Sequence, residues 1–153
     1  MKRSKTQVSR IRFFNEKNKY KVKSIRKIRL WLISCANIEG KRIDELNFIF
    51  CEDNYLLNIN KEYLKHNYLT DIITFDYSDN LSIIFGDAYI SIDRAKENAK
   101  LYKQTLSMEV RRLLIHGLLH LMGYSDKSEN NKKIMRDLED NYLEYFSKES
   151  SRQ

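Results

Sequence analysis

The chain has 153 residues, of which 42% are hydrophobic and 12% aromatic, and it contains no proline. These values are typical of a globular protein with one sizeable core, and they exclude an intrinsically disordered chain. No apolar run is long enough to cross a bilayer, and none follows the basic N-terminus, so we expect no membrane anchor and no secretory signal. We therefore expect a cytoplasmic protein that folds as one domain over residues 1–153, with residues 1–7 as a loose polar start.

The positive charge is concentrated at the N-terminus. The formal net charge is +7, but residues 1–30 hold 12 of the 28 Lys and Arg residues and a single acidic residue, Glu16, whereas the rest of the chain has a net charge of −4. A basic stretch of this kind is typical of a surface that binds nucleic acid. A lysine-rich solvated surface is the alternative, and charge alone does not decide between them.

The predicted elements alternate between strands and helices. We expect strands at residues 8–14, 46–51, 71–77 and 81–92, the last interrupted at Gly86. We expect helices at residues 20–38, 53–64, 91–102, then one capped by Thr105 or Ser107, and a last one at 128–146. The first two strands, joined through a helix, suit a parallel crossover, and the last two, joined by a short turn, suit antiparallel pairing. The expected fold class is therefore α/β (α+β), a small mixed four-stranded sheet packed with about five helices.

The two cysteines, Cys35 and Cys51, do not form a C-x-x-C pair. One falls in a predicted helix and the other in a predicted strand. We expect both to be reduced and buried, as in a cytosolic protein.

The most informative stretch runs from Ile115 to Asp126 and reads I-H-G-L-L-H-L-M-G-Y-S-D. Two of only three histidines, His116 and His120, are four residues apart and therefore share one face of a helix. Gly123 permits a sharp turn that can bring Asp126 back toward the two rings. His116, His120 and Asp126 would form a three-ligand set with a fourth position left for water, which is the form of a catalytic zinc site. The alternative is a pair of core histidines satisfied by their neighbours.

The same spacing occurs in metzincin proteases, but one residue differs. Zincins place a glutamate directly after the first histidine to act as general base. Gly117 stands at this position and has no side chain that could move a proton. The sequence therefore disfavours a peptidase of that mechanism.

Three blocks together resemble the YbeY endoribonucleases. H-G-L-L-H-L-M-G-Y-S-D is similar to the family signature H-G-x-L-H-L-x-G-Y-D-H. Asn60 to Tyr63 with Thr70 to Phe75, and Phe85 to Ser91, are similar to two further family blocks and follow in the same order. The resemblance implies a metal-dependent endoribonuclease specific for single strands, acting in ribosomal RNA maturation with one Zn²⁺ per chain. It makes His116 and His120 catalytic residues, and it implies ribosomal RNA and the small ribosomal subunit or its proteins as partners, and no membrane.

The chain departs from the family pattern at two positions. The third histidine of the family aligns with Asp126, which adds one negative charge to the ligand set and would make the metal less Lewis acidic. A family arginine aligns with Leu64, which removes a phosphate contact. Lys61 and Lys65 can supply charge nearby, and Arg26, Lys27 and Arg29 are the candidate RNA-binding residues in the N-terminal segment. His66 is either a functional neighbour or a surface residue.

Two other functions remain possible from the sequence. One is a zinc metallopeptidase, which the missing glutamate disfavours. The other is a non-catalytic RNA-binding factor for ribosome assembly that uses a metal only to hold its fold, which the open fourth metal position disfavours. No residue stands out as the general base.

Overall fold

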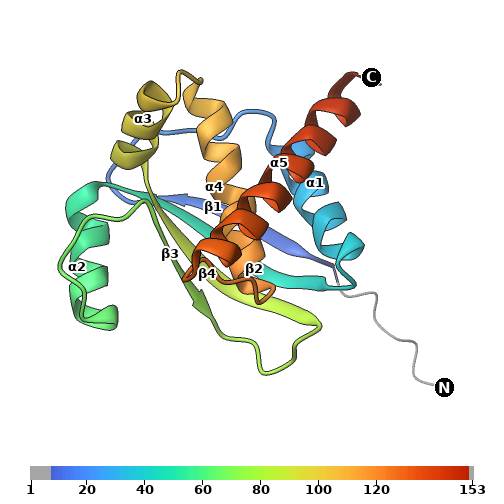
Figure 1. Cartoon of the computed structure of the whole chain (residues 1–153), viewed down its shortest axis with the longest axis horizontal. Helices are drawn as coiled ribbons and strands as arrows, with labels where there is room; N and C mark the ends of the chain where they lie inside the picture. The colour runs from blue at the N-terminus through green and yellow to red at the C-terminus, as the bar shows by residue number, and fades with distance from the viewer. Residues whose placement is uncertain (1–7, 152–153) are drawn as a thin grey trace.

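The computed structural model describes residues 8–151 and contains a four-stranded sheet with five helices (Figure 1). The predicted start at residues 1–7 lies outside the described residues. In chain order the elements are β1 (Arg10–Asn15), α1 (Ile25–Ile38), β2 (Arg42–Cys51), α2 (Asp53–Leu64), β3 (Ile72–Asp76), β4 (Ile83–Ser91), α3 (Ile92–Leu101), α4 (Leu106–Leu121) and α5 (Glu129–Ser151).

The sheet is mixed, with the strand order β1-β2-β4-β3. β1 pairs parallel with β2, β2 pairs parallel with β4, and β3 pairs antiparallel with β4. The predicted fold class is therefore confirmed, including the parallel crossover through α1 and the antiparallel last pair. β3 forms one edge of the sheet, and its position beside α4 places it at the candidate site.

Most of the core lies on one face of the sheet, between the strands and helices α1, α4 and α5 (Figure 1). Alternate strand residues point into it because successive side chains in a strand point to opposite faces. α4 contributes an almost continuous apolar surface and is the central helix of this layer. The largest fully buried side chains are Phe48, Phe50, Ile28, Leu32, Ile43, Leu46, Leu56, Ile84, Ile90, Leu114, Ile115 and Leu118.

The other face of the sheet carries a smaller cluster. Cys51, Ile73 and Leu56 pack there, with Ile59 and Tyr89 beside them, so α2 covers part of this face. The two cysteines are free and buried, as predicted, and burial raises the pKa of each thiol to about 12. Both thiols therefore stay protonated and serve as small apolar groups.

Several boundaries differ from the predicted ones. The first helix begins at Ile25 rather than at residue 20, because Ser24 adopts a left-handed conformation with φ 56° directly before it. β4 runs without interruption through Gly86. Asp53 does not cap α2 as its sequence position suggests. Its carboxylate instead accepts hydrogen bonds from Ser91 and Arg94 at the start of α3. Within the described residues, no helix is long and apolar enough to span a membrane.

Candidate metal centre

Helix α4 presents two histidines on one side while burying most of its surface. Its start is fixed by Thr105, whose hydroxyl accepts a hydrogen bond from the Met108 backbone N–H at 3.2 Å. The leucines around the histidines are buried in the core, whereas His116 and His120 are only partly buried. The apolar packing of α4 therefore fixes the backbone from which the two rings project.

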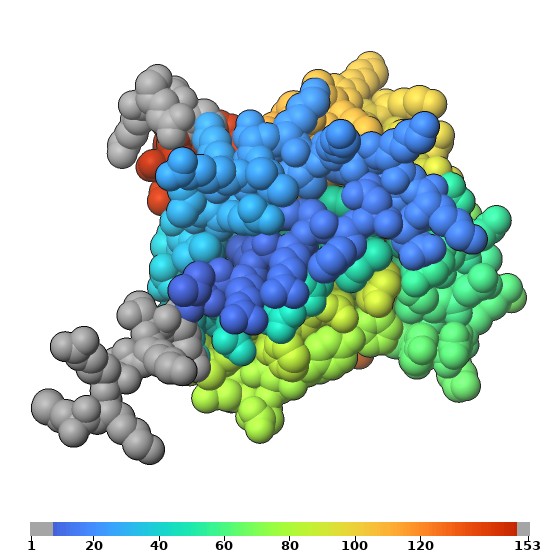
Figure 2. Space-filling view, turned by 180° about the vertical axis from the view of Figure 1, so that it is seen from behind, coloured from blue at the N-terminus to red at the C-terminus, as the bar shows by residue number. Residues whose placement is uncertain are grey.

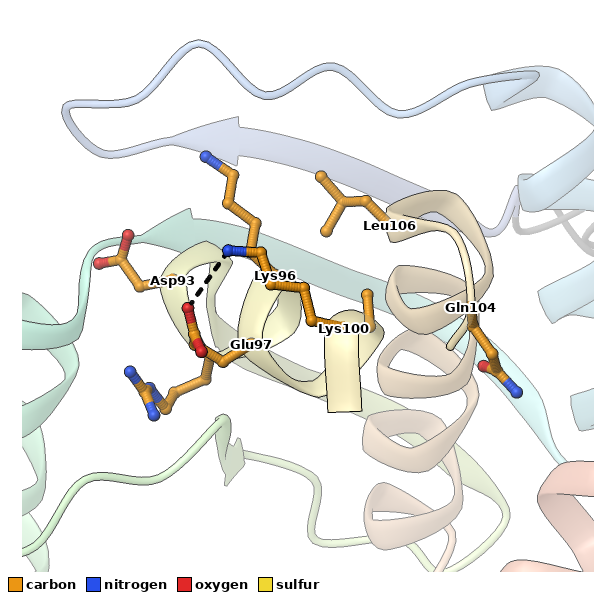
Figure 3. Close-up of a pocket in the computed structure, with 8 residues that line it drawn as sticks. Asp93, Lys96, Glu97, Lys100, Gln104 and Leu106 are labelled. Atoms are coloured by element: carbon orange, nitrogen blue, oxygen red, sulfur yellow. Dashed lines mark ion pairs between the residues drawn. The ribbon is translucent and has the colours of Figure 1, made fainter. Parts of the chain in front are cut away.

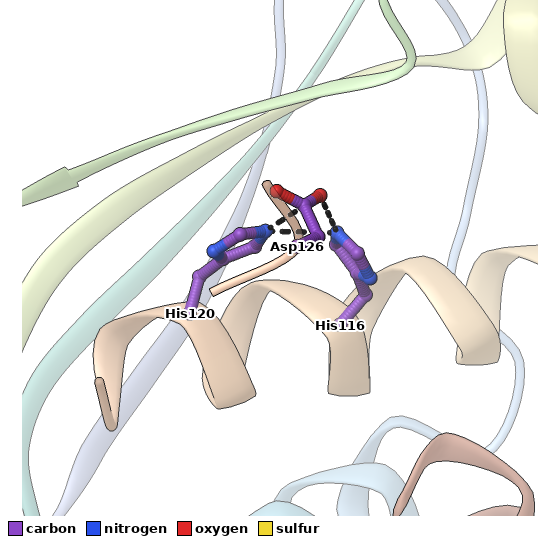
Figure 4. Close-up of side chains that lie close together, drawn as sticks. All are labelled: His116, His120 and Asp126. Carbon is purple, nitrogen blue, oxygen red and sulfur yellow. Dashed lines mark hydrogen bonds and ion pairs between the residues drawn. The ribbon is translucent and has the colours of Figure 1, made fainter. Parts of the chain in front are cut away.

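His116, His120 and Asp126 come together in space, as the sequence predicted (Figure 4). The Nε2 atoms of His116 and His120 are 3.0 Å apart. Asp126 Oδ2 lies 3.3 Å from His120 Nε2 and 3.6 Å from His116 Nε2. Three atoms that can bind a metal thus form a nearly equilateral triangle.

The size of this triangle fits a zinc ion. Zinc binds imidazole nitrogen and carboxylate oxygen at about 2.0–2.2 Å in tetrahedral geometry, so two ligand atoms of such a site lie about 3.3 Å apart. The three observed separations bracket this value. The Asp126 side chain is 44% exposed, so the centre is open to solvent on one side. An open side is what a catalytic site needs for water or substrate as a fourth ligand.

A buried carboxylate holds the ring of His116. Glu139 in α5 is 7% exposed, and its Oε2 lies 2.6 Å from His116 Nδ1. The other oxygen of Glu139 accepts a hydrogen bond from Arg112 Nη1 at 2.9 Å, and Arg112 Nη2 donates to Asp140 at 2.7 Å. A carboxylate on Nδ1 sets the tautomer of the ring and leaves Nε2 for the metal.

Their surroundings shift the pKa values of the two histidines in opposite directions. Burial disfavours the protonated ring of His116, but the hydrogen bond and charge of Glu139 outweigh it, so the pKa of His116 is raised. Burial and the neighbouring charge of His116 lower the pKa of His120. The surroundings therefore favour the protonated form of His116 and the neutral form of His120, and a metal binds the neutral form of each ring.

The loop that carries Asp126 is tied to the rest of the fold. Gly123 has φ +102°, which lets the chain turn sharply after α4. Tyr124 then donates a hydrogen bond to Glu39 at 3.2 Å, and Tyr142 of α5 donates to the same carboxylate at 2.8 Å. Contacts with α1 and α5 thus fix the path of the loop just before Asp126.

The candidate metal centre borders a cleft of about 310 Å³. Side chains from the residue before β3, from α3 and the turn after it, from α4, from α5 and from the loop between α4 and α5 line this cleft, and they include acidic, basic and amide groups. The lining residues are Asp71, Asn98, Tyr102, Glu109, Arg112, Leu113, His116, Asp126, Lys132, Met135, Arg136 and Glu139. A separate hollow between α3 and the start of α4 is lined by no histidine, and a Glu97–Lys100 ion pair of 3.8 Å lies along α3 at its edge (Figure 3).

The five predicted RNA-binding residues do not line the cleft. Arg26 is exposed on α1, whereas Arg29 Nε donates to the Ile11 carbonyl at 2.8 Å and Lys27 Nζ lies 4.9 Å from the centre of the Phe146 ring. Lys61 and Lys65 are exposed at the end of α2. Figure 2 shows the molecule from behind, and the residues of β1 and of its connection to α1, coloured blue, form part of this face.

Sequence reasoning missed the residues around the histidines. Glu139 is 23 positions after His116 and Asp71 is 45 positions before it, so neither shows a local spacing signal. Lys132 and Arg136 are cations that line the cleft. The sequence did not single them out, because the helix that carries them contains many other charged residues. His66, in contrast, stacks on Tyr68 at 5.1 Å and takes no part in the cluster.

Comparisons with known proteins show the family of the chain. A model of the family described as endoribonuclease YbeY matches residues 10–147. The chain belongs to the endoribonuclease YbeY family. A member from Cytophaga hutchinsonii is 50% identical over 128 residues, which cover 84% of this chain and 90% of that protein. A member from Karelsulcia muelleri is 48% identical over 118 residues, covering 77% and 83%. A solution structure from Thermotoga maritima has a TM-score of 0.64 at 23% identity and covers 93% of this chain and 92% of its own, so the two share the fold.

Asn60 and Leu64 of the second sequence block lie outside the cleft. Asn60 is buried, and its side chain donates to the Tyr68 carbonyl at 2.9 Å, so it holds the segment that leads from α2 into β3. Leu64, for which the sequence resemblance predicted the place of a family arginine, is 42% exposed at the end of α2. The position is therefore solvent-accessible but carries no charge.

The third ligand is testable by substitution. Asp126→Ala should lose most of the bound metal, whereas Asp126→His should retain it, because both carboxylate and imidazole reach zinc at about 2.0–2.2 Å. The measurement is metal content per folded chain by atomic emission. Full metal content in Asp126→Ala would exclude the ligand role.

The contact between Glu139 and His116 makes a second prediction. Glu139→Gln keeps the shape of the side chain but removes the charge that holds the ring, so zinc affinity should fall by about 10–100-fold. Competition with a chromophoric chelator measures this affinity. Asp140→Asn is the matched control, because Asp140 also pairs with Arg112 but does not contact a histidine. Equal affinities in the two variants would contradict the role of Glu139.

Proposed function

We propose that this protein is a metal-dependent endoribonuclease that cleaves single-stranded RNA. The observation that supports this proposal most strongly is the cluster of His116, His120 and Asp126, whose potential ligand atoms are 3.0–3.6 Å apart. The cluster borders an open cleft, and the chain belongs to the YbeY family. On the same basis we propose maturation of the 3′ end of small-subunit ribosomal RNA as its role, in the cytoplasm. Its partners would be ribosomal RNA and the small ribosomal subunit or its proteins.

One Zn²⁺ per chain would be held by His116, His120 and Asp126. When bound, zinc polarises a phosphoryl oxygen and lowers the pKa of a nearby water toward about 7. The chain itself supplies the orientation of the ligands, through Glu139 on His116 and the fixed loop before Asp126. Arg136 and Lys132 line the same cleft and can attract the phosphates of a strand that enters it.

The two alternative functions are supported less well. A peptidase of the zincin type needs a glutamate where Gly117 stands, and this position is packed against Ile72 and Ala88. A purely structural metal would be enclosed by four protein ligands, whereas three are present among the described residues and Asp126 is exposed. Both observations favour catalysis on a substrate that enters the open cleft.

Cleavage should depend on the metal and on the strand being unpaired. The purified protein should cut single-stranded RNA, leave duplex RNA and casein intact, and lose activity with EDTA until zinc is restored. His120→Ala, prepared in the same way, is the control for contaminating nuclease. Nuclease activity that survives both EDTA and His120→Ala would contradict the proposal.

The basic surface should govern affinity more than turnover. Replacing Arg26, Lys27 and Arg29 with glutamine should weaken RNA binding. It should also reduce the slope of log affinity against log salt by about 0.7 for each phosphate that the protein no longer neutralises. Lys96, Lys100 and Lys103, changed together to glutamine, remove the same charge away from α1 and should leave the slope unchanged. Thermal unfolding checks the Arg29 change, since Arg29 also binds the Ile11 carbonyl. An unchanged slope in the first variant would mean that RNA does not contact α1.

A further inference from the structure

The face of α4 that would carry a zincin base is closed by the sheet. A Cβ atom on Gly117 would lie 3.0 Å from Ile72 Cδ1 and 3.4 Å from Ala88 Cβ. Most real Cβ contacts are longer than these, so a side chain at position 117 could be placed only if Ile72 and Ala88 moved away from α4. If a carboxylate is to accept a proton near the metal centre, another element must provide it.

Strand β3 brings a carboxylate to that place. Asp71 directly precedes Ile72, the residue that packs on Gly117, and it lines the cleft together with His116 and Asp126.

Asp71 is held in place by two hydrogen bonds, one to its backbone and one to its side chain. Its backbone carbonyl accepts a hydrogen bond from the Ser91 N–H at 2.9 Å, and its Oδ2 accepts one from Asn98 Nδ2 at 3.2 Å. Asn98 Nδ2 also lies 3.4 Å from Oε1 of Glu109, a residue of α4 that is 3% exposed. Asn98 therefore links Asp71 to the helix that carries the histidines.

One oxygen of Asp71 remains available. Among the described residues, Oδ2 has the Asn98 bond and Oδ1 has no hydrogen-bond partner. Both oxygens of Glu139 are engaged, by His116 and Arg112. Glu109 Oε2 also has no hydrogen-bond partner among the described residues, but this atom is buried and Glu109 is only 3% exposed. Asp71 is thus the cleft carboxylate, apart from the ligand Asp126, that has an oxygen free to meet a molecule in the cleft.

We propose that Asp71 is the catalytic proton acceptor of this site, supplied by the sheet in place of the helix glutamate of zincins. The inference rests on the proposed phosphodiesterase function. A water oxygen attacks the phosphorus and forms the new P–O bond, and its proton passes to the Asp71 carboxylate. The bond from phosphorus to the leaving ribose oxygen breaks, the electron pair goes to that oxygen, and the oxygen takes up a proton, which the Asp71 carboxyl group can return.

The test compares Asp71→Asn with Asp76→Asn. The first change keeps the shape of the side chain and an oxygen that can accept the Asn98 bond, but it removes the base. The second is the same change at the other end of β3, where Asp76 is exposed and accepts a hydrogen bond from the Ser78 N–H. The readouts on the full zinc-loaded chain are zinc affinity, RNA binding, and kcat and KM for single-stranded RNA and for bis(p-nitrophenyl) phosphate.

Asp71→Asn should keep zinc affinity, RNA binding and KM, and it should lower kcat on both substrates by about a hundredfold or more. Asp76→Asn should match the parent in every measurement. Loss of zinc in Asp71→Asn would make Asp71 a ligand, and weaker RNA binding with unchanged kcat would make it a binding residue. Either result would overturn the proposal. If the parent protein cleaves the small diester but not RNA, the proposed substrate is wrong. The kcat of Asp71→Asn on the small diester then still tests the role of Asp71.

Discussion

The close contact between α4 and the sheet at Gly117 is the constraint on which the rest of the site depends. Because Gly117 has no side chain, Ile72 of β3 and Ala88 of β4 can lie directly against the helix. His116 directly precedes Gly117 and His120 follows it by three residues on the same helix, so this contact helps to position the backbone that carries both rings. It also places the start of β3, with Asp71, at the edge of the cleft.

Charge is balanced around the centre by groups from two helices. Glu139 is buried, and a buried carboxylate is costly unless it is paired. It is paired on one side with His116 and on the other with Arg112, which reaches on to Asp140. The position of His116 therefore depends on how α5 packs on α4. A substitution that shifts either helix should also shift this candidate metal ligand.

An aspartate at position 126 fits this balance. Asp126 adds a negative charge on the open side of the centre, where solvent and the cations Lys132 and Arg136 are near. The loop before Asp126 does not depend on the identity of that residue, because it is fixed by Gly123 and by the Tyr124–Glu39 contact. Either a carboxylate or an imidazole at position 126 can therefore act as the third metal ligand.

Much of the fold could be predicted from local patterns. The mixed pairing of the sheet follows from the chain order and the connection lengths, and the i, i+4 histidines with Gly123 predicted the triangle with Asp126. What the sequence could not indicate depends on long-range packing. Glu139 and Asp71 reach the cleft only because α5 and β3 pack against α4, and the start of α1 is set by the left-handed Ser24 rather than by the apolar pattern.

Zinc K-edge X-ray absorption of the zinc-loaded protein tests the central claim most directly, because it reads the ligand atoms themselves. The account predicts two imidazole nitrogens at about 2.0–2.1 Å with their characteristic outer-shell scattering, and oxygen at about 2.0–2.2 Å. A sulfur shell at about 2.3 Å, or a first shell without imidazole, would place the metal elsewhere and contradict the account.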